Sequence, residues 1–184
     1  MSEKEKMLAG ELYDANYDKE LIKDRYEAKD ICFEYNNLKP SDYENKDRLI
    51  KKLFAKTGKQ IIVEQNFWCD YGYNIFVGEN FYMNHNCTIL DGAKVEFGDN
   101  VFVAPNCGFY TAGHPLDYET RNKGLEYAKP IKIGNNVWIG GNVIVLPGVN
   151  IGDNVVIGAG SVVNKDIPSN SMAVGIPCKV IKKI

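Results

Sequence analysis

The sequence predicts a mainly β protein, a parallel β-helix with an N-terminal helical cap, and three observations indicate it. Between Ile133 and Ile167 an aliphatic residue recurs every six positions and is most often followed by glycine. A period of six fits neither a 3.6-residue helix nor an alternating strand, but it is typical of a chain that turns a corner every six residues. By contrast, residues 1–57 carry 25 of the 46 charged residues, and residues 111–130 interrupt the repeat.

The repeat is regular enough to assign a role to each place. Its first place holds aliphatic residues, which we expect to point into a prism-like interior: Ile133, Ile139, Val145, Ile151, Ile157 and Val163. The second place is most often glycine, which we expect to allow the tight corner. An earlier run of the repeat slips by two residues before Phe97, and this slip predicts a bulge near Asp91–Lys94.

Residues 1–57 are expected to cover the open end of the β-helix, because such an end exposes unpaired strand edges. Ser2-x-x-Glu5 is a candidate capping box for a short first helix. Asp18 is a candidate cap for a second helix, from Lys19 to about Asn36. Ser41-x-x-Glu44 is a candidate capping box for a third helix, which Gly58 would end.

Residues 58–184 are expected to form the β-helix domain. Residues 111–130 would be an inserted loop, and a loop of this length in a compact domain is usually functional or disordered. Residues 168–184 would be a C-terminal tail that leaves the coils, because Pro168, Gly175 and Pro177 bend the chain. Val180 and Ile181 can form an edge strand in this tail.

Composition excludes several classes of partner. A net charge of −2 gives no reason to expect a nucleic acid or an anionic membrane as partner. No apolar run approaches the roughly 20 residues of a membrane span or forms a signal peptide. The five cysteines include no CxxC pair, and we expect free thiols in a cytoplasmic protein.

His114 is the first candidate for chemistry, because it lies in the long interruption of the repeat. An imidazole that titrates near neutral pH suits a general base, although an exposed loop histidine is an equal alternative. His85 lies inside a hexad, and two histidines without a third make a poor zinc site, so no metal is expected. Lys165, Lys179 and Lys182 indicate either a phosphate-bearing ligand or a solvated tail.

Several motifs together resemble one family. They are MLAGELYDA near the N-terminus, CDYGYNIFVGENFYMN, TAGHP, KPIKIGNNVWIGG, PGVNIGDNVVIGAGSVVNKDIP and GIPCKVIKKI. The sequence resembles the maltose and galactoside O-acetyltransferases, which are hexapeptide-repeat acyltransferases, and is most similar to the maltose branch. The resemblance implies a left-handed parallel β-helix and a homotrimer with active sites between neighbouring subunits. It also implies transfer of an acetyl group from acetyl-CoA to a sugar hydroxyl, without a metal.

The resemblance assigns roles to particular residues. It implies that His114 is the general base, that Asn84 acts on the acceptor side, and that the Gly141 amide stabilises the oxyanion. The implied acceptor-binding residues are Asp14, Arg25, Asp70, Tyr82 and Asp91. The implied coenzyme A-binding residues are Gly141, Ala159, Asn164, Lys165, Lys179 and Lys182.

Departures from the family pattern concern the acceptor more than acetyl transfer. Galactoside-type relatives have a second aspartate where this chain has Gly92, and Asn164 replaces a common threonine. Glu126 lies where relatives vary and could orient His114. Two alternatives stay open, an acetyltransferase of another small acceptor such as a xenobiotic, and a non-catalytic solenoid that binds or assembles. A γ-class carbonic anhydrase would require three histidine ligands, and this chain has two histidines.

Overall fold

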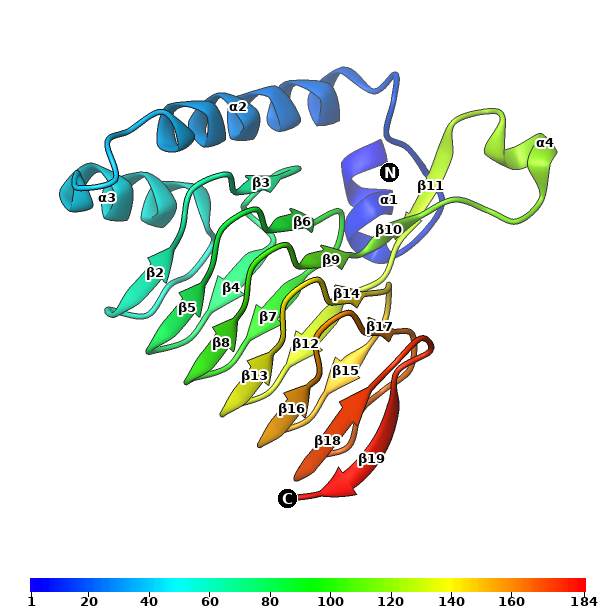
Figure 1. Ribbon diagram of the computed structural model, residues 1–184. Coiled ribbons are helices and arrows are strands. Elements are labelled where there is room, and N and C mark those ends of the chain that lie inside the picture. The colour runs from blue at the N-terminus through cyan, green and yellow to red at the C-terminus, as the bar shows by residue number, and fades with distance from the viewer.

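The computed structural model describes residues 1–184 and contains a parallel β-helix with one end covered by helices (Figure 1). Successive coils lie side by side, and each coil contributes a strand to three faces of a prism. The predicted fold class, a left-handed parallel β-helix with an N-terminal helical cap, is confirmed. No helix has the length and apolar character that crossing a membrane requires.

Each face takes its name from its number of strands. The seven-stranded face contains β2 (Ile61–Val63), β5 (Phe81–Met83), β8 (Val101–Val103), β13 (Val137–Ile139), β16 (Val155–Ile157), β18 (Ser171–Val174) and β19 (Lys179–Lys183). The five-stranded face contains β3 (Trp68–Cys69), β6 (Thr88–Leu90), β9 (Gly108–Tyr110), β14 (Ile144–Val145) and β17 (Val162–Val163). The four-stranded face contains β4 (Ile75–Val77), β7 (Val95–Phe97), β12 (Ile131–Ile133) and β15 (Asn150–Ile151).

The interior of the prism is a continuous apolar core. All six aliphatic residues of the predicted first place are at most 2% exposed. Earlier coils add aromatic residues, and the ring of Phe97 contacts those of Phe81 and Phe109 at centroid distances of 5.1 and 5.0 Å. Burial of these side chains stabilises the coils, because each removes apolar surface from water.

Most corners turn on an asparagine, not on the glycine that precedes it. Nine asparagines have positive φ, and each is the third residue of its corner: Asn66, Asn80, Asn86, Asn100, Asn106, Asn136, Asn142, Asn154 and Asn170. Asparagine tolerates this left-handed conformation. A Cβ atom on Gly140 would instead lie 2.6 Å from the backbone nitrogen of Ala159 in the next coil. These glycines are required because a side chain would clash with the next coil, as predicted, whereas the left-handed turn itself falls on the asparagine.

The two-residue slip of the repeat lies in a corner and distorts no strand. Ile61 pairs with Phe81, so a coil before the loop takes 20 residues, whereas the pairing of Ile133 with Ile151 shows 18 after it. The extra residues at 91–94 belong to the same corner as those at 70–74 in the previous coil. The predicted bulge is absent, because neighbouring coils carry the same insertion and keep their register.

The cap consists of α1 (Glu3–Ala9), α2 (Lys19–Asn36) and α3 (Tyr43–Leu53). The capping box at Ser2 and the cap at Asp18 are confirmed. The capping box at Ser41 was wrong, because the Asp42 side chain accepts from the Asn45 amide one residue later. The helix also ends before Gly58, since the Ala55 amide already donates to the Ile75 carbonyl of the first coil.

The inserted loop has secondary structure of its own. It contains β10 (Ala112–Gly113), α4 (Tyr118–Arg121) and β11 (Leu125–Ala128). Strand β11 also pairs with β1 (Tyr13–Asp14) of the cap, which makes a three-stranded antiparallel sheet. The cap therefore holds the loop through backbone hydrogen bonds.

The coils continue further toward the C-terminus than predicted. Strand β18 pairs in parallel with β16, so the chain remains in the solenoid beyond Pro168. Strand β19 then returns antiparallel along β18 and forms the expected edge strand.

Candidate functional site

Most of the predicted site residues lie along the two edges of the five-stranded face, and Tyr82, Lys179 and Lys182 lie on the seven-stranded face. The loop edge borders the four-stranded face and carries residues 70–74, 91–94, 111–130 and 164–166. The Asn84 edge borders the seven-stranded face and carries residues 84–87, 140–143 and 158–161. In Figure 1 the loop with β10, β11 and α4 extends from one end of β9, and the turn from β8 enters the other end. Within one chain, the five-stranded face separates the two edges.

At the loop edge, His114 follows β10 and its ring is oriented by the main chain. The Nδ1 atom lies 2.9 Å from the carbonyl oxygen of Leu125 in β11. A carbonyl oxygen can only accept a hydrogen bond, so Nδ1 carries the proton of the neutral ring. The Nε2 atom therefore has a free lone pair, and the side chain is 46% exposed. This geometry suits a base that receives a proton from a bound molecule.

Glu126 lies next to the free nitrogen of His114. Its Oε1 atom is 3.7 Å from Nε2 of His114, which is within ion-pair range and beyond hydrogen-bond range. Its Oε2 atom accepts a hydrogen bond of 3.1 Å from the hydroxyl of Tyr13. Tyr13 is fully buried, and burial, with the charge of Glu126, raises the pKa of its hydroxyl. The Leu125 carbonyl bonds to Nδ1, so Glu126 acts on the opposite side of the ring.

Arg25 and Asp70 lie close enough to Glu126 that its charge acts on both. Arg25 donates from Nη1 to the hydroxyl of Tyr71 at 3.0 Å, and from Nη2 to the carbonyl of Ala15. Burial raises the pKa of Asp70, while the positive charge of Arg25 opposes this shift. The loop edge thus gathers a cation and two carboxylates near His114.

The two other acceptor candidates on this side of the molecule have structural partners. Asp14 lies in β1, and its Oδ1 atom accepts from the amides of Asn16 and Tyr17. Asp91 is fully buried and accepts from the amides of Asp70 and Tyr71 at 3.0 and 2.8 Å. The structure gives Asp91 these structural partners, and its predicted contact with the acceptor stays a prediction. Its carboxylate fills a widened corner, where the backbone amides require an acceptor.

The Asn84 edge presents hydrogen-bond donors of the repeat itself. The amide of Gly141 donates to no other group of the chain. The Oδ1 atom of Asn84 accepts from the amide of His85 at 2.7 Å, which leaves the side-chain NH₂ group of Asn84 without a partner. Tyr82 lies in the middle of β5, on the outside of the neighbouring seven-stranded face.

The predicted coenzyme residues also fall on different parts of the surface. Ala159 lies one coil beyond Gly141, and the two corners are joined by a hydrogen bond of 2.8 Å from the Gly160 amide to the Gly141 carbonyl. Asn164 and Lys165 are exposed at the loop edge. Lys179 and Lys182 are exposed on the outer strand β19. No single face of one chain carries all six residues.

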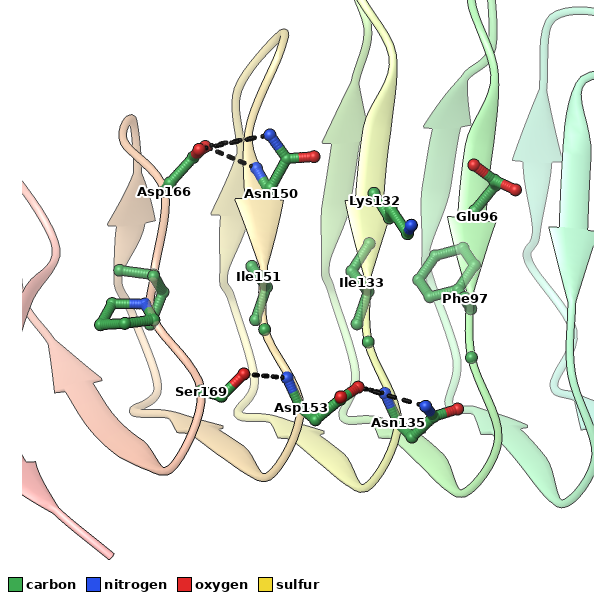
Figure 2. A pocket seen from close by; sticks show the side chains of 15 residues that line it. Glu96, Phe97, Lys132, Ile133, Asn135, Asn150, Ile151, Asp153, Asp166 and Ser169 are labelled. Atoms are coloured by element: carbon green, nitrogen blue, oxygen red, sulfur yellow. Dashed lines mark hydrogen bonds between the residues drawn. The ribbon is translucent and has the colours of Figure 1, made fainter.

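A surface groove away from these edges contains none of the predicted site residues. It has a volume of about 830 Å³ and lies on the four-stranded face, between Glu96 and Ser169 (Figure 2). Several of its polar groups bond to one another across coils. The Asp153 carboxylate accepts from the Asn135 amide at 2.6 Å, and the Asp153 amide donates to the Ser169 hydroxyl at 2.9 Å. These bonds join the corners of successive coils, so these groups have a structural role.

Comparison with known proteins agrees with the fold and its cap. The model described as maltose acetyltransferase hexapeptide capping motif matches residues 6–58, and the bacterial transferase hexapeptide (six repeats) matches residues 130–165. A putative acetyltransferase of Saccharomyces cerevisiae is 59% identical over 98% of this chain and 92% of its own length. The galactoside O-acetyltransferase of Escherichia coli K12 is 47% identical over 98% and 88%. The chain belongs to the maltose and galactoside O-acetyltransferase family.

Solved structures support the same assignment. A maltose O-acetyltransferase from Clostridium difficile 630 superposes with a TM-score of 0.99 at 59% identity, covering 100% of this chain and 98% of that one. A galactoside acetyltransferase in complex with coenzyme A superposes with a TM-score of 0.96 at 47% identity, covering 100% and 92%. This family member is therefore an acyltransferase.

Two residues of the loop edge escaped the sequence reasoning, Tyr13 and Tyr71. Tyr13 meets Glu126 because β1 pairs with β11, 113 residues away along the chain. Tyr71 holds Arg25 because α2 packs across the first coil. Both residues lie in motifs that the family resemblance rests on, MLAGELYDA and CDYGYNIFVGENFYMN, but the spacing within those motifs gives no sign of which side chains they hold.

Proposed function

We propose that this family member transfers an acetyl group from acetyl-CoA to a sugar hydroxyl, of the maltose, glucose or galactoside type. The observation that carries the proposal is the His114 ring, whose Nδ1 is bonded to Leu125 and whose Nε2 is free. The names of the relatives support the acceptor class, and the coenzyme A in the galactoside acetyltransferase structure supports the donor.

In the proposed reaction, Nε2 of His114 takes the proton of the acceptor hydroxyl as its oxygen attacks the thioester carbonyl carbon. The carbon–oxygen bond forms, and the negative charge of the tetrahedral intermediate lies on the former carbonyl oxygen. The free amide of Gly141 donates to that oxygen. The intermediate then expels the coenzyme A thiolate, which takes the proton from His114. No acyl-enzyme forms, so no side-chain nucleophile is required.

The divided site supports a homotrimer with active sites between subunits. His114 and Gly141 lie at opposite edges of the five-stranded face, so a second copy has to supply one of them. The seven-stranded face exposes large apolar side chains from three of its strands, β2, β8 and β13: Ile62 (54%), Phe102 (43%) and Trp138 (57%). Trp68 is exposed on the five-stranded face, whereas the four-stranded face presents Lys132 and Asn150. Two unlike apolar faces fit a head-to-tail contact that closes into a ring.

Within that assembly, each set of residues keeps its proposed role. Arg25, Asp70, Tyr82 and Asn84 bind the acceptor, and Asp14 supports this pocket through its turn. Gly141 and Ala159 would bind the coenzyme along the Asn84 edge, together with Asn164 and Lys165 from a loop edge. Lys179 and Lys182 are exposed cations that suit its phosphate groups. A cytoplasmic location agrees with the supply of acetyl-CoA.

The test is release of free coenzyme A thiol from acetyl-CoA with a panel of sugars and one of amine and xenobiotic acceptors. We expect turnover on at least one sugar, and His114→Ala is expected to lower kcat by about 10²–10⁴-fold. Turnover of a xenobiotic without turnover of any sugar would overturn the acceptor class. Equal rates for the wild type and His114→Ala would overturn the base.

A further inference from the structure

We propose that Tyr13 of the cap is a positioning residue, which holds the Glu126 carboxylate beside Nε2 of His114. Glu126 then stabilises the positive charge that His114 acquires when it takes the acceptor proton. This inference rests on the proposed function, because it requires His114 to act as the base. It assigns to the cap a part in the reaction, beyond covering the end of the β-helix.

The contacts form a chain from the cap to the base. The Tyr13 side chain is 1% exposed, and its hydroxyl donates to Oε2 of Glu126 at 3.1 Å. The other carboxylate oxygen, Oε1, is 3.7 Å from Nε2 of His114. Tyr13 and Glu126 are direct partners in the β1–β11 pairing, so the backbone keeps the two side chains together. One oxygen of Glu126 is thus held by the cap, and the other faces the base.

Gly92 leaves the space that the tyrosine hydroxyl occupies. A Cβ atom at Gly92 would lie 2.9 Å from the Tyr13 hydroxyl and 3.2 Å from Cβ of Ala128. Any larger residue at this corner would push the hydroxyl away from its position. The hydroxyl is therefore fixed by packing as well as by its hydrogen bond, and Gly92 provides an independent way to displace it.

The distance from Glu126 to His114 suits an interaction that strengthens during the reaction. In the neutral ring, Nε2 presents a lone pair to the carboxylate, and two acceptors cannot form a hydrogen bond. When Nε2 takes the proton, it becomes a cationic donor that faces a carboxylate. Because this interaction exists only after proton transfer begins, it lowers the barrier and does not tighten ground-state binding. The proton leaves again with the coenzyme A thiolate, so Glu126 is unchanged after turnover.

The experiment measures kcat and both KM values for Glu126→Gln, Tyr13→Phe and the double variant, on the sugar that the wild type acetylates. Glu126→Gln keeps the shape and an acceptor for Tyr13 but removes the charge, and kcat is expected to fall about 10- to 100-fold. Tyr13→Phe keeps the ring in the core, and kcat is expected to fall about 2- to 10-fold. Both KM values are expected to stay within about twofold.

The double variant separates positioning from packing. If Tyr13 acts through the charge of Glu126, Tyr13→Phe lowers kcat in the wild type and has little further effect in the Glu126→Gln background. Tyr73→Phe is the matched control, because its hydroxyl also donates to a carboxylate, Oδ2 of Asp24, at 3.1 Å. Its kcat is expected to equal that of the wild type.

Gly92→Ala tests the same coupling by a different route. We expect it to reproduce the kcat loss of Tyr13→Phe, again without a change in either KM. The inference is overturned by an equal loss from Tyr13→Phe in both backgrounds, by unchanged kcat in Glu126→Gln, or by a loss confined to the KM of the acceptor. These outcomes leave the proposed function intact if the His114→Ala variant has lost its activity. Failure of the proposed function would instead appear as a His114→Ala variant with the wild-type rate.

Discussion

The two edges of the five-stranded face are built in different ways. The Asn84 edge consists of repeated corners, and its proposed donors are a backbone amide at Gly141 and an asparagine within the repeat. The loop edge joins segments that lie far apart along the chain, the cap strand β1, helix α2, the first corner and β11. Its geometry depends on individual side chains.

Because of this difference, the two edges tolerate different substitutions. At position 141 of the Asn84 edge the side chain can change as long as the backbone donor remains, because the coils hold the amide in place. At the loop edge, loss of one partner releases another, as Tyr71 holds Arg25 and Tyr13 holds Glu126. In the proposed function, the repeat therefore supplies a rigid donor surface, and the cap with its loop supplies the groups that distinguish one acceptor from another.

The largest effect is expected from mixing variants of the two edges. His114→Ala removes the base from the loop edge, and Asn84→Ala removes the donor from the Asn84 edge, so each homotrimer is expected to be inactive. In a mixed trimer, one neighbouring pair combines an intact His114 with an intact Asn84. Co-expressed mixed trimers, separated by two affinity tags, are expected to recover about one third of the wild-type rate.

Mixed trimers without activity would contradict a site that is shared between subunits. Homotrimers of each single variant, expressed with both tags and purified in the same way, give the baseline rate. A monomer in analytical ultracentrifugation would contradict the assembly itself, before any rate is measured.

The next effect tests whether the Asn84 edge acts through its backbone. Gly141→Pro removes one N–H group, and kcat is expected to fall by about 10²–10³-fold, as for loss of one oxyanion donor. Proline fits this corner, because Pro105 occupies the same place in the previous coil, where Val103 pairs with Ile139. Thermal unfolding is expected to stay close to that of the wild type. A wild-type rate in a folded Gly141→Pro variant would contradict the donor role.

Gly140→Ala is the matched control for Gly141→Pro, because it disturbs the packing of the coils at the neighbouring position. Its Cβ atom would lie 2.6 Å from the backbone nitrogen of Ala159, so the coils have to separate. We expect a clear loss of thermal stability, in contrast to Gly141→Pro. Together the two variants distinguish the packing role of Gly140 from the donor role of Gly141.

Sequence alone predicted the coils well, because their physics is local and periodic. Six-residue spacing identified the inward residues such as Ile139 and Val145, and Asp18 marked the start of α2. The predicted N-cap of α3 was wrong because two neighbouring residues, Ser41 and Asp42, can both cap a helix. The clash at the second-place glycine was predicted, but the left-handed asparagine that follows it, such as Asn142, was not.

The site was predictable to the extent that it interrupts the pattern. His114 was found because the loop breaks the repeat, and its free Nε2 agrees with a base. The burial of Asp91 was not predicted, because nothing in the sequence shows that the widened corner turns its carboxylate inward. Tyr13 and its bond to Glu126 depend on a strand pairing across 113 residues, which spacing cannot show.

The smallest effect on turnover is expected from Asp91→Asn, which tests the support beneath the loop edge. Burial raises the pKa of Asp91 from 3.8 to about 7, although the amides of Tyr71 and Asn74 favour the carboxylate. The folded state therefore retains a proton that the unfolded state has lost between about pH 4 and pH 7. This group stabilises the fold fully below about pH 4, and its contribution is lost as the pH rises to about 7.

The expected loss from this one group is on the order of 4 kcal/mol, from about three pKa units at about 1.36 kcal/mol each. The side-chain amide introduced by Asp91→Asn is neutral throughout and can still accept from the Asp70 and Tyr71 amides, so the variant should lack this part of the pH dependence. Urea unfolding of both proteins from pH 4 to pH 8 measures the difference, which should grow with pH in favour of the variant. Parallel curves would show that Asp91 is ionised in the fold, held by its amides against the effect of burial.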